Sequence, residues 1–252
     1  MGSFPQSIVH YLPVTDHDER WGIVCTTAGY QNVPPGSPYP LTQHPDSYSF
    51  TRSRGRVLGE YQLLYIVSGQ GEFRSASSPA APVKAGTVVM LFPDEWHTYA
   101  PAPETGWEEW WVGFRGENID RRVAEGFFSP KTPLLHIGHS AGIVSCYQEI
   151  IRSAEEERKG FQQLVTGIVL HLLGSVLFKR DNLQYLDNPI VEKINRAREM
   201  MRRHIGDNLP PEEIARRLNI GYTWFRRTFR AYVGIAPAQY QLQLRHNKAR
   251  EL

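Results

Sequence analysis

The 252-residue sequence contains little of what marks several common classes of protein. It has only two cysteines, Cys25 and Cys146, which lie far apart and match no metal-binding or redox spacing. Such sparse cysteine fits a reducing, cytoplasmic compartment, and we expect both thiols to be small buried side chains. The N-terminus lacks a basic start followed by an apolar run, so no secretory signal is predicted. No segment reaches the apolar length of a membrane span, so no membrane partner is expected.

The net charge is also small, because the sequence has 28 Lys and Arg residues and 26 Asp and Glu residues. The balance is uneven along the chain. From Pro189 onward there are 13 basic and six acidic residues, against 15 and 20 in the rest. A basic C-terminal quarter is typical of a segment that binds a polyanion such as nucleic acid.

The chain divides into a β-rich first part and a helical second part. Short apolar runs between turn residues predict antiparallel strands that close into a sandwich or small barrel. We expect strands at 21–27, 61–68, 71–75, 87–92 and 107–114, with a tight turn at 68–71. Helical spacing predicts helices at 118–128, 141–152, 161–178, 190–205 and 238–252, and the polar stretch 181–189 is expected to be a linker. The fold class is therefore α+β and multidomain.

The helix expected at 161–178 has the most regular apolar spacing in the chain. Leu164, Ile168 and Leu172 repeat along it every four residues, within a broad apolar stripe. Such a stripe must be covered, either by the β-rich part of the same chain or by the same helix of a second chain. Both interpretations stay open. Under the second, we predict a homodimer with these three residues as its central contacts.

Residues 210–237 form the pattern of two short helices joined by a sharp turn. Ala215 is small enough to let the helices touch, and Gly221 is expected to supply the backbone freedom of the turn. The second helix is expected to turn Trp224, Phe225, Thr228 and Phe229 inward and Thr223, Arg226, Arg227 and Arg230 outward. An arginine-rich outer face beside a sharp turn indicates a DNA-binding helix-turn-helix, although an ordinary solvated face would look similar.

We predict distinct DNA contacts for this second helix. Arg226 and Arg227 are expected to reach base edges in the major groove, with Thr223 beside them. The residues expected to contact the DNA backbone are Tyr222, Trp224 and Arg230.

The run IARRLNIGYTWFRRTFRAYVGIAPAQYQLQLRHNKAREL resembles the DNA-binding region of the AraC family of bacterial transcription regulators. In that family the residues matching Phe229, Gly234 and Pro237 close the second helix and start a long connecting helix. The resemblance implies a transcription regulator, activator or repressor, that binds double-stranded DNA as a homodimer and has RNA polymerase as a further partner. The family has a second helix-turn-helix where this sequence stops at Leu252, so we expect a truncated DNA-binding domain with weak sequence-specific binding.

Three further runs, RVLGEYQLLYIVSGQGEF, GTVVMLFPDEWHTY and WEEWWVGF, resemble the sugar-binding cupin barrel of the same family in order and spacing. The resemblance implies a cupin-like effector-binding and dimerisation domain at 1–180, a linker at 181–189 and a helix-turn-helix DNA-binding domain at 190–252. It also assigns roles in the barrel: Thr42 and Arg56 to sugar hydrogen bonds, Tyr99 to the pocket wall, Trp111 to stacking on the sugar ring and Glu109 to a position where arabinose-binding members have a histidine. The effector is then a monosaccharide or sugar acid of unknown identity.

These roles also make sense from the chemistry of the residues. An indole packs on the C–H face of a sugar, while charged groups offset the desolvation of its hydroxyls, as Trp111, Arg56 and Glu109 could do. Strand alternation puts Glu109 and Trp111 on one face and Trp110 on the other, so we expect Trp110 to be structural. The alternative is that all these tryptophans belong to the core and rim of the barrel.

A cupin-type metal-dependent enzyme acting on a small polar metabolite is the rival interpretation. Such a site needs two or three histidines and a carboxylate inside the barrel. The run GEYQ at 59–62 has no histidine, and His97 stands alone in PDEWHTY. We therefore expect His97 to be a hydrogen-bonded barrel residue, and the protein to have no metal, no cofactor and no catalytic activity.

Overall fold

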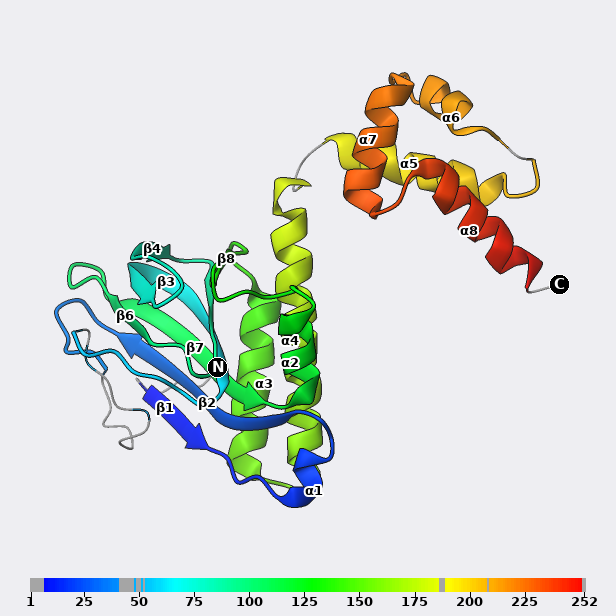
Figure 1. The fold of residues 1–252 in the computed structure, drawn as a ribbon. Coiled ribbons are helices and arrows are strands. Elements are labelled where there is room, and N and C mark those ends of the chain that lie inside the picture. Colours follow the sequence, from blue (N-terminus) through cyan, green and yellow to red (C-terminus); the bar gives the residue numbers. More distant parts are fainter. Residues whose placement is uncertain are drawn as a thin grey trace. The chain divides into compact units, whose positions relative to one another are not determined.

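The structure, a computed structural model, describes residues 7–40, 48, 51, 53–185, 189–207 and 209–250. The chain forms two compact units, Met1–Leu183 and Gln184–Leu252 (Figure 1). The described strands are β1 Ser7–Tyr11, β2 Val24–Val33, β3 Tyr61–Ser75, β4 Ala81–Lys84, β5 Thr87–Leu91, β6 His97–Pro101, β7 Trp107–Arg115 and β8 Leu134–His136. The helices are α1 Asp16–Glu19, α2 Glu117–Ala124, α3 Ala141–Glu156, α4 Phe161–Asn182, the 3-10 helix Leu183–Tyr185, α5 Pro189–Arg203, α6 Pro211–Arg217, α7 Tyr222–Val233 and α8 Pro237–Ala249.

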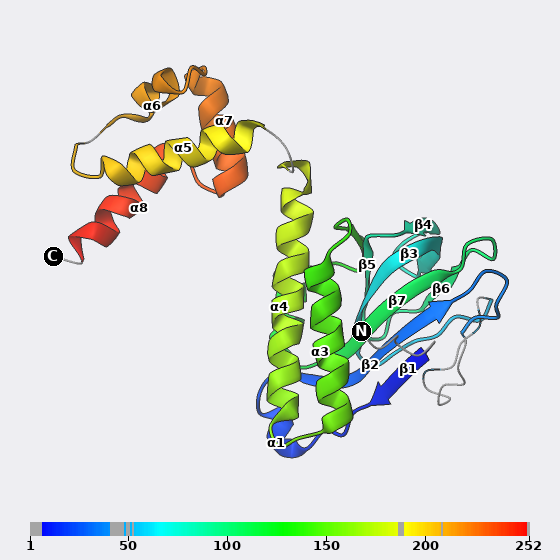
Figure 2. The same cartoon turned by 180° about the vertical axis from the view of Figure 1, so that it is seen from behind.

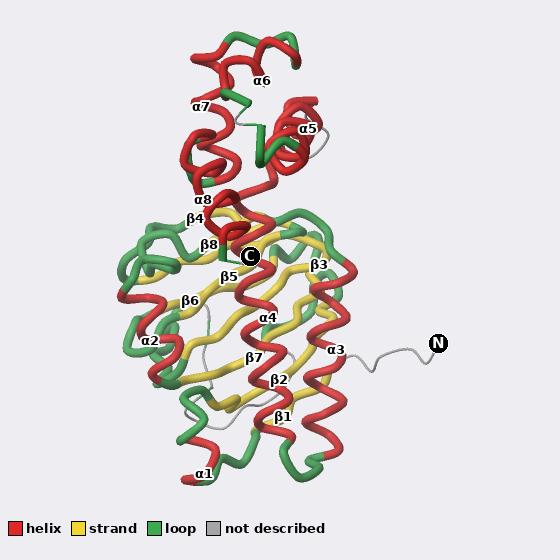
Figure 3. The backbone as a smooth tube through the Cα atoms, turned by 90° about the vertical axis from the view of Figure 1, so that its right-hand side faces the viewer, coloured by secondary structure: helices red, strands yellow, loops and turns green. Residues whose placement is uncertain are grey.

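The long strand β3 joins two antiparallel sheets in the first unit. Its first half lies between β7 and β5, in a sheet of order β1-β2-β7-β3-β5-β8. Its second half pairs with β4 and β6. Helices α3 and α4 run side by side along one face of the strands (Figures 2 and 3). This is the expected fold class, a cupin-like β-barrel followed by helices.

The large sheet carries a hydrophobic core on each face. On the outer face, Trp110 of β7 packs near Tyr147 of α3, with 6.5 Å between ring centroids. On the inner face, Trp107 and Trp111 of the same strand join a separate cluster inside the barrel. The alternation along β7 is therefore as predicted, with Trp110 on the structural side.

The tight turn expected at 68–71 does not form. β3 runs straight through it, with a register shift between Ile66 and Ser68. Gly69 has φ +81°, and a Cβ there would lie 2.1 Å from the carbonyl oxygen of Gly106. The glycine therefore serves a β-bulge and a close approach of two backbones, not a chain reversal.

The other strand predictions differ mainly at the ends. β2 starts at Val24, and Trp21, expected to begin that strand, is 57% exposed. Strands β1, β4, β6 and β8 were not expected, because they carry too little periodicity to mark them.

One face of α4 is covered by the first unit itself. Val165, Val169 and Leu172 are buried in the outer core, where α4 packs on α3 and β2. By length and composition α4 could span a membrane, contrary to the expectation above, but its buried face is part of this core. The helix also continues through 181–182, which the sequence assigned to the linker.

The second unit has its own core, built from α5 to α8. Ile194 and Met201 of α5 meet Ala215 of α6 and Phe225 and Phe229 of α7. Ala215 is 1% exposed, so the small residue lies at the helix contact as predicted.

The turn between α6 and α7 uses a different residue from the one expected. Asn219 has φ 55°, in the left-handed region that asparagine tolerates. Gly221 has φ −66° and ψ 136°, which any residue can adopt. The backbone freedom of the turn is therefore required at Asn219 and not at Gly221.

Candidate functional site

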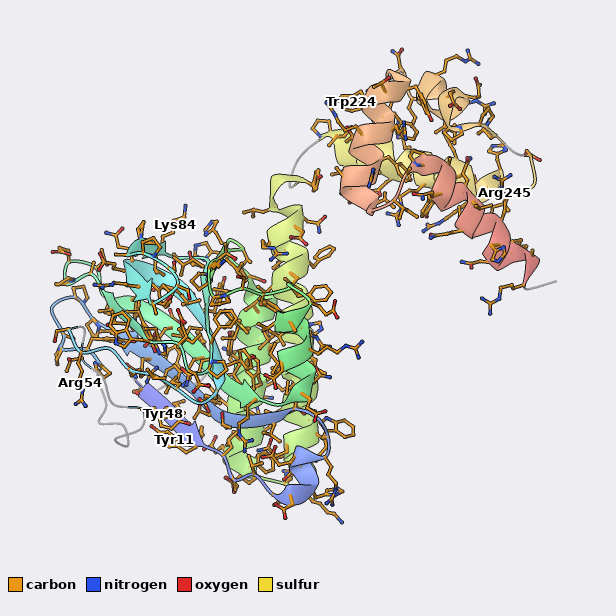
Figure 4. All side chains as sticks on the ribbon, in the orientation of Figure 1. Tyr11, Tyr48, Arg54, Lys84, Trp224 and Arg245 are labelled. Atoms are coloured by element: carbon orange, nitrogen blue, oxygen red, sulfur yellow. The ribbon has the colours of Figure 1, made fainter. Side chains whose placement is uncertain are left out.

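A narrow pocket with about 20 Å³ of free volume lies on the inner side of the barrel. Adjacent strands supply its wall, since Gln31 of β2 lies opposite Glu109 of β7 in the sheet register. Tyr11 and Tyr48 lie close together at β1 (Figure 4), with 5.1 Å between ring centroids. The lining residues are Val9, Tyr11, Thr27, Gln31, Tyr39, Pro40, Tyr48, Arg56, Gln62, Tyr99, Glu109 and Trp111. The lining is thus mixed, with aromatic rings beside charged and amide groups.

The structure brings together four of the five residues predicted to bind an effector. Arg56, Tyr99, Glu109 and Trp111 all line this pocket. Thr42 lies outside the described residues. Effector binding by any of the five stays a prediction.

The indole of Trp111 lies against the backbone of β2. Gly29 pairs with Trp111 in register, and a Cβ at Gly29 would lie 2.1 Å from the indole Cζ2. Trp111 itself is 9% exposed. The missing side chain at Gly29 therefore makes the space in which the indole sits at the pocket wall.

The guanidinium of Arg56 is held by four groups of the barrel. Nη1 donates to the carbonyl of Tyr48 at 2.6 Å, and Nη2 donates to the hydroxyl of Tyr99 at 2.8 Å and to Gln62 at 3.4 Å. Nε donates to Nε2 of His97 at 3.2 Å. A cation fixed in this way is a preorganised hydrogen-bonding group at the pocket wall.

His97 is neutral in this network. Its Nε2 accepts from Arg56, so Nδ1 carries the proton and donates to the carbonyl of Glu95 at 3.0 Å. Burial, and then the charge of Arg56, lower the pKa of His97 to about 4. His97 is therefore a hydrogen-bonded barrel residue, as predicted. Within the described part of the chain, no three His, Cys, Asp or Glu side chains gather as a metal site.

Of two buried carboxyls near the pocket, Glu60 is satisfied by the protein. Its oxygens accept from Gln62 at 2.9 Å, from the hydroxyl of Tyr48 at 3.1 Å and from that of Thr27 at 3.4 Å. A Cβ at Gly113 would lie 2.3 Å from Oε1 of Glu60, so that glycine makes room for the carboxyl.

Glu109 is different because only one of its oxygens is satisfied. Oε1 accepts from the hydroxyl of Tyr39 at 2.9 Å, whereas Oε2 has no hydrogen-bond partner among the described residues. The side chain is 2% exposed. Burial raises the pKa of Glu109 to about 7, while the Tyr39 hydrogen bond, the charge of Arg56 and the indole N–H of Trp107 act to lower it.

Sequence reasoning did not identify several of the lining residues, among them Gln62, Tyr39 and Tyr48. A signal existed for Gln62, because Glu60 and Gln62 are polar residues at alternate positions entering an apolar strand. Tyr39 and Tyr48 lie outside regular strands, where no periodicity marks the side that faces the pocket.

In the second unit, α7 presents the predicted outward face. Phe225 and Phe229 are fully buried, as predicted. Trp224 was also predicted to turn inward, but its side chain is 40% exposed, so that prediction is wrong. Tyr222 is half-buried, and burial and then the carboxyl of Glu212 in α6 raise its pKa. The exposed residues of the predicted DNA-contacting set are Thr223, Trp224, Arg226, Arg227 and Arg230.

The arginines of α6 and α7 differ in their pairing. In α6, the carboxyl of Glu213 accepts from Arg216 at 2.7 Å and from Arg217 at 2.8 Å. The three arginines of the α7 face form no salt bridge with any residue in the described ranges. More positive charge is therefore available to an anion on α7 than on α6.

The outer face of α4 bears only part of the predicted dimer contact. Leu164 is 52% exposed, and Ile168 is half-buried. Leu172 is fully buried among residues of its own chain, so it is not available to a second chain and the prediction is wrong for this residue. Phe178 is 69% exposed on the same helix.

Comparison with known proteins gives a family match. The model of the AraC-like ligand binding domain matches residues 35–173, more than half of the chain. The matched segment contains strands β3 to β8 and eight of the twelve residues that line the pocket.

Individual relatives are distant. The Msm operon regulatory protein of Streptococcus mutans serotype c is 22% identical over 199 residues, which cover 78% of this chain and 71% of that protein. The raffinose operon transcriptional regulatory protein RafR of Pediococcus pentosaceus is 20% identical over 215 residues, covering 81% and 74%. The crystal structure of ToxT from Vibrio cholerae O395 aligns with 95% of this chain and 98% of its own at 9% identity, but a TM-score of 0.28 is too low to support an argument.

Proposed function

This chain belongs to the family with the AraC-like ligand-binding domain, and from that premise we propose that it regulates transcription as a DNA-binding protein whose effector is a sugar. The relatives that match most of its length are, by name, regulators of operons, one of them a raffinose operon. The proposed activity is binding and control, without catalysis.

One observation carries the sugar proposal: an indole and two charged side chains converge in one buried pocket. Trp111 offers an apolar surface for the C–H face of a sugar, and Arg56 and Glu109 offer hydrogen bonds for its hydroxyls. The tyrosines of the pocket lining add further aromatic surface, and each also carries a hydroxyl group that can form a hydrogen bond. Such a mixture of rings and hydrogen-bonding groups suits a neutral polyol better than a purely apolar ligand.

The DNA proposal rests on the face of α7. Its arginines are exposed and not engaged in salt bridges within the described chain, and they project from the second helix of a helix-turn-helix. The paired arginines of α6 do not add to this face. We further propose that the regulator acts in the cytoplasm as a homodimer, through the outer face of α4, and that RNA polymerase is its partner in transcription.

The sugar proposal is tested by a thermal-shift screen with D-glucose, D-galactose, L-arabinose and raffinose. A bound sugar stabilises the protein by RT ln(1 + [L]/Kd), so the effector raises the melting temperature as its concentration rises. Trp111→Ala should abolish that shift. Trp21→Ala is the matched control, since Trp21 is an exposed tryptophan outside the pocket lining, and it should keep the shift. A screen without any shift would count against a sugar of this group.

A further inference from the structure

We propose that Oε2 of Glu109 accepts a hydrogen bond from a hydroxyl group of the sugar and that Glu109 releases its proton when the sugar binds, which makes effector binding depend on pH. The inference rests on the proposed function of the pocket as a sugar site. It adds the release of a proton to the hydrogen-bonding role that the proposed function already gives to Glu109.

The geometry around the carboxyl carries the first step. Glu109 is 98% buried and lines the pocket, and its Oε1 is occupied by the hydroxyl of Tyr39. Oε2 has no donor among the described residues. A buried oxygen left in this state costs free energy, which a donor on a ligand in the pocket would recover.

The contrast with Glu60 shows that the barrel can satisfy a carboxyl when the role is structural. Glu60 accepts three hydrogen bonds, from Tyr48, Thr27 and Gln62, which involve both of its oxygens. Glu109 lies on the same inner surface, yet it accepts one. The difference points to a binding role for the second oxygen of Glu109.

The groups that act on this carboxyl come from several elements. Tyr39, in the segment after β2, donates to it, and Arg56, in the segment before β3, acts on it through its charge. Tyr99 of β6 is coupled to it by charge. The indole N–H of Trp107, on the same strand as Glu109, also acts to lower its pKa, but it does not reach hydrogen-bonding geometry, since neither Nε1 of Trp107 nor Oε2 of Glu109 has a partner among the described residues. Burial outweighs all of them, so the pKa of Glu109 lies near 7 and the carboxyl is protonated in mildly acidic solution.

A sugar hydroxyl changes that balance. Donation to Oε2 stabilises the carboxylate over the acid, so the pKa of Glu109 falls when the sugar binds. Between the bound and the free pKa, binding releases the carboxyl proton to the solvent, and no bond of the sugar is broken. Affinity then rises with pH, by up to about tenfold per unit, and becomes constant above the free pKa.

An acidic sugar would give the opposite sign. A ligand carboxylate beside Oε2 would share the proton of Glu109 and would bind more tightly at low pH. Arg56, its natural counter-ion, already donates to four groups of the protein. The proposal is therefore a neutral sugar.

The test is isothermal titration of D-glucose, D-galactose, L-arabinose and raffinose into the full chain at pH 5.5, 6.5, 7.5 and 8.5. Two buffers of different ionisation enthalpy report the proton released. For the sugar that binds, we expect Kd to fall about tenfold between pH 5.5 and 6.5 and to level off above pH 7.5. Glu109→Gln should remove both the slope and the proton release. Glu108→Gln, the neighbour on the same strand that does not line the pocket, should keep them.

Tyr39→Phe is a second variant that keeps the carboxyl and so remains informative if Glu109→Gln does not fold. It removes the donor to Oε1, which should raise the pKa of Glu109 and move the pH at which affinity levels off upward. If a sugar binds with equal affinity at every pH, or binds more tightly at low pH, the proton coupling is overturned. Either result leaves the proposal of a sugar site intact. The absence of binding at all four values would overturn the sugar proposal itself, and the inference with it.

Discussion

At the scale of single residues, Glu109 also affects the stability of the fold. Its pKa is about 4.5 when unfolded and about 7 when folded, so its contribution to stability is fully present below pH 4.5 and is lost as pH rises to 7. Urea unfolding should therefore show that Glu109→Gln gains stability relative to the parent between pH 5 and pH 8, by about 1–3 kcal/mol. Glu108→Gln should show no such gain. A constant difference between parent and Glu109→Gln across this window would contradict the assigned pKa.

Gly29 is the residue whose substitution should disturb the pocket most directly. A methyl group there would meet the indole of Trp111, so we expect Gly29→Ala to cost about 1–3 kcal/mol and to abolish the sugar response. Gly59→Ala is the control, because a Cβ at Gly59 has open space around it. Both variants can be compared by urea unfolding and tryptophan fluorescence. An unaltered sugar affinity in Gly29→Ala would show that the position of Trp111 does not matter to binding.

How much of the pocket the sequence can reveal depends on local regularity. Trp110 and Trp111 could be separated from sequence alone, because both lie on a strand with a strict period of two. Tyr39 could not be placed, because the segment between β2 and β3 has no such period and its contact with Glu109 spans 70 residues. Half-satisfied groups such as Glu109 likewise become visible only when the distances to their neighbours are known.

At the scale of elements, helices were predicted more reliably than strand connections. The apolar period of α4 and the turn residues around α6 and α7 are local signals, and the structure places these helices close to their expected bounds. β3 was split in error because a glycine pair is a turn signal by sequence but a bulge in this fold. Which of the two forms depends on the backbone across the sheet, and no local pattern contains that information.

The helix α7 carries the DNA prediction. Arg226→Ala or Arg227→Ala should relax base preference at one position and cost about 1–3 kcal/mol, if the side chain contacts a base. Arg230→Ala should weaken binding to all DNA sequences by the same factor. It should also reduce the slope of log affinity against log salt concentration by about 1. Site selection and fluorescence anisotropy at several salt concentrations separate the two effects. Arg216→Ala is the control, since Glu213 already pairs with that side chain. An unchanged preference in both base-contact variants would remove them from that role.

The outer face of α4 carries the dimer prediction. Leu164 is exposed and does not belong to the outer core, so Leu164→Glu should leave the fold intact while placing a charge in the interface. We expect monomers in sedimentation velocity. Leu242→Glu, at a similarly exposed leucine of α8, should remain dimeric. A dimeric Leu164→Glu variant would place the contact elsewhere.

At the scale of the whole molecule, the two candidate sites belong to two units with separate cores. The pocket lies within the first and the arginine face within the second. Calorimetry of the full chain should therefore resolve two transitions, and sugar at 100 times its Kd should stabilise only the first, by about 2.7 kcal/mol. A single transition that shifts as a whole would show that the units unfold together.

The alternation along β7 has a consequence for how such proteins diversify. Positions 109 and 111 face the pocket, while position 110 between them faces the helices. Under the proposed function, a single substitution at an inward position would change which effector binds and would leave the packing of the outward neighbour unchanged. Related proteins can thus evolve new ligand specificities through substitutions at inward positions, while selection for folding continues to act on the outward positions.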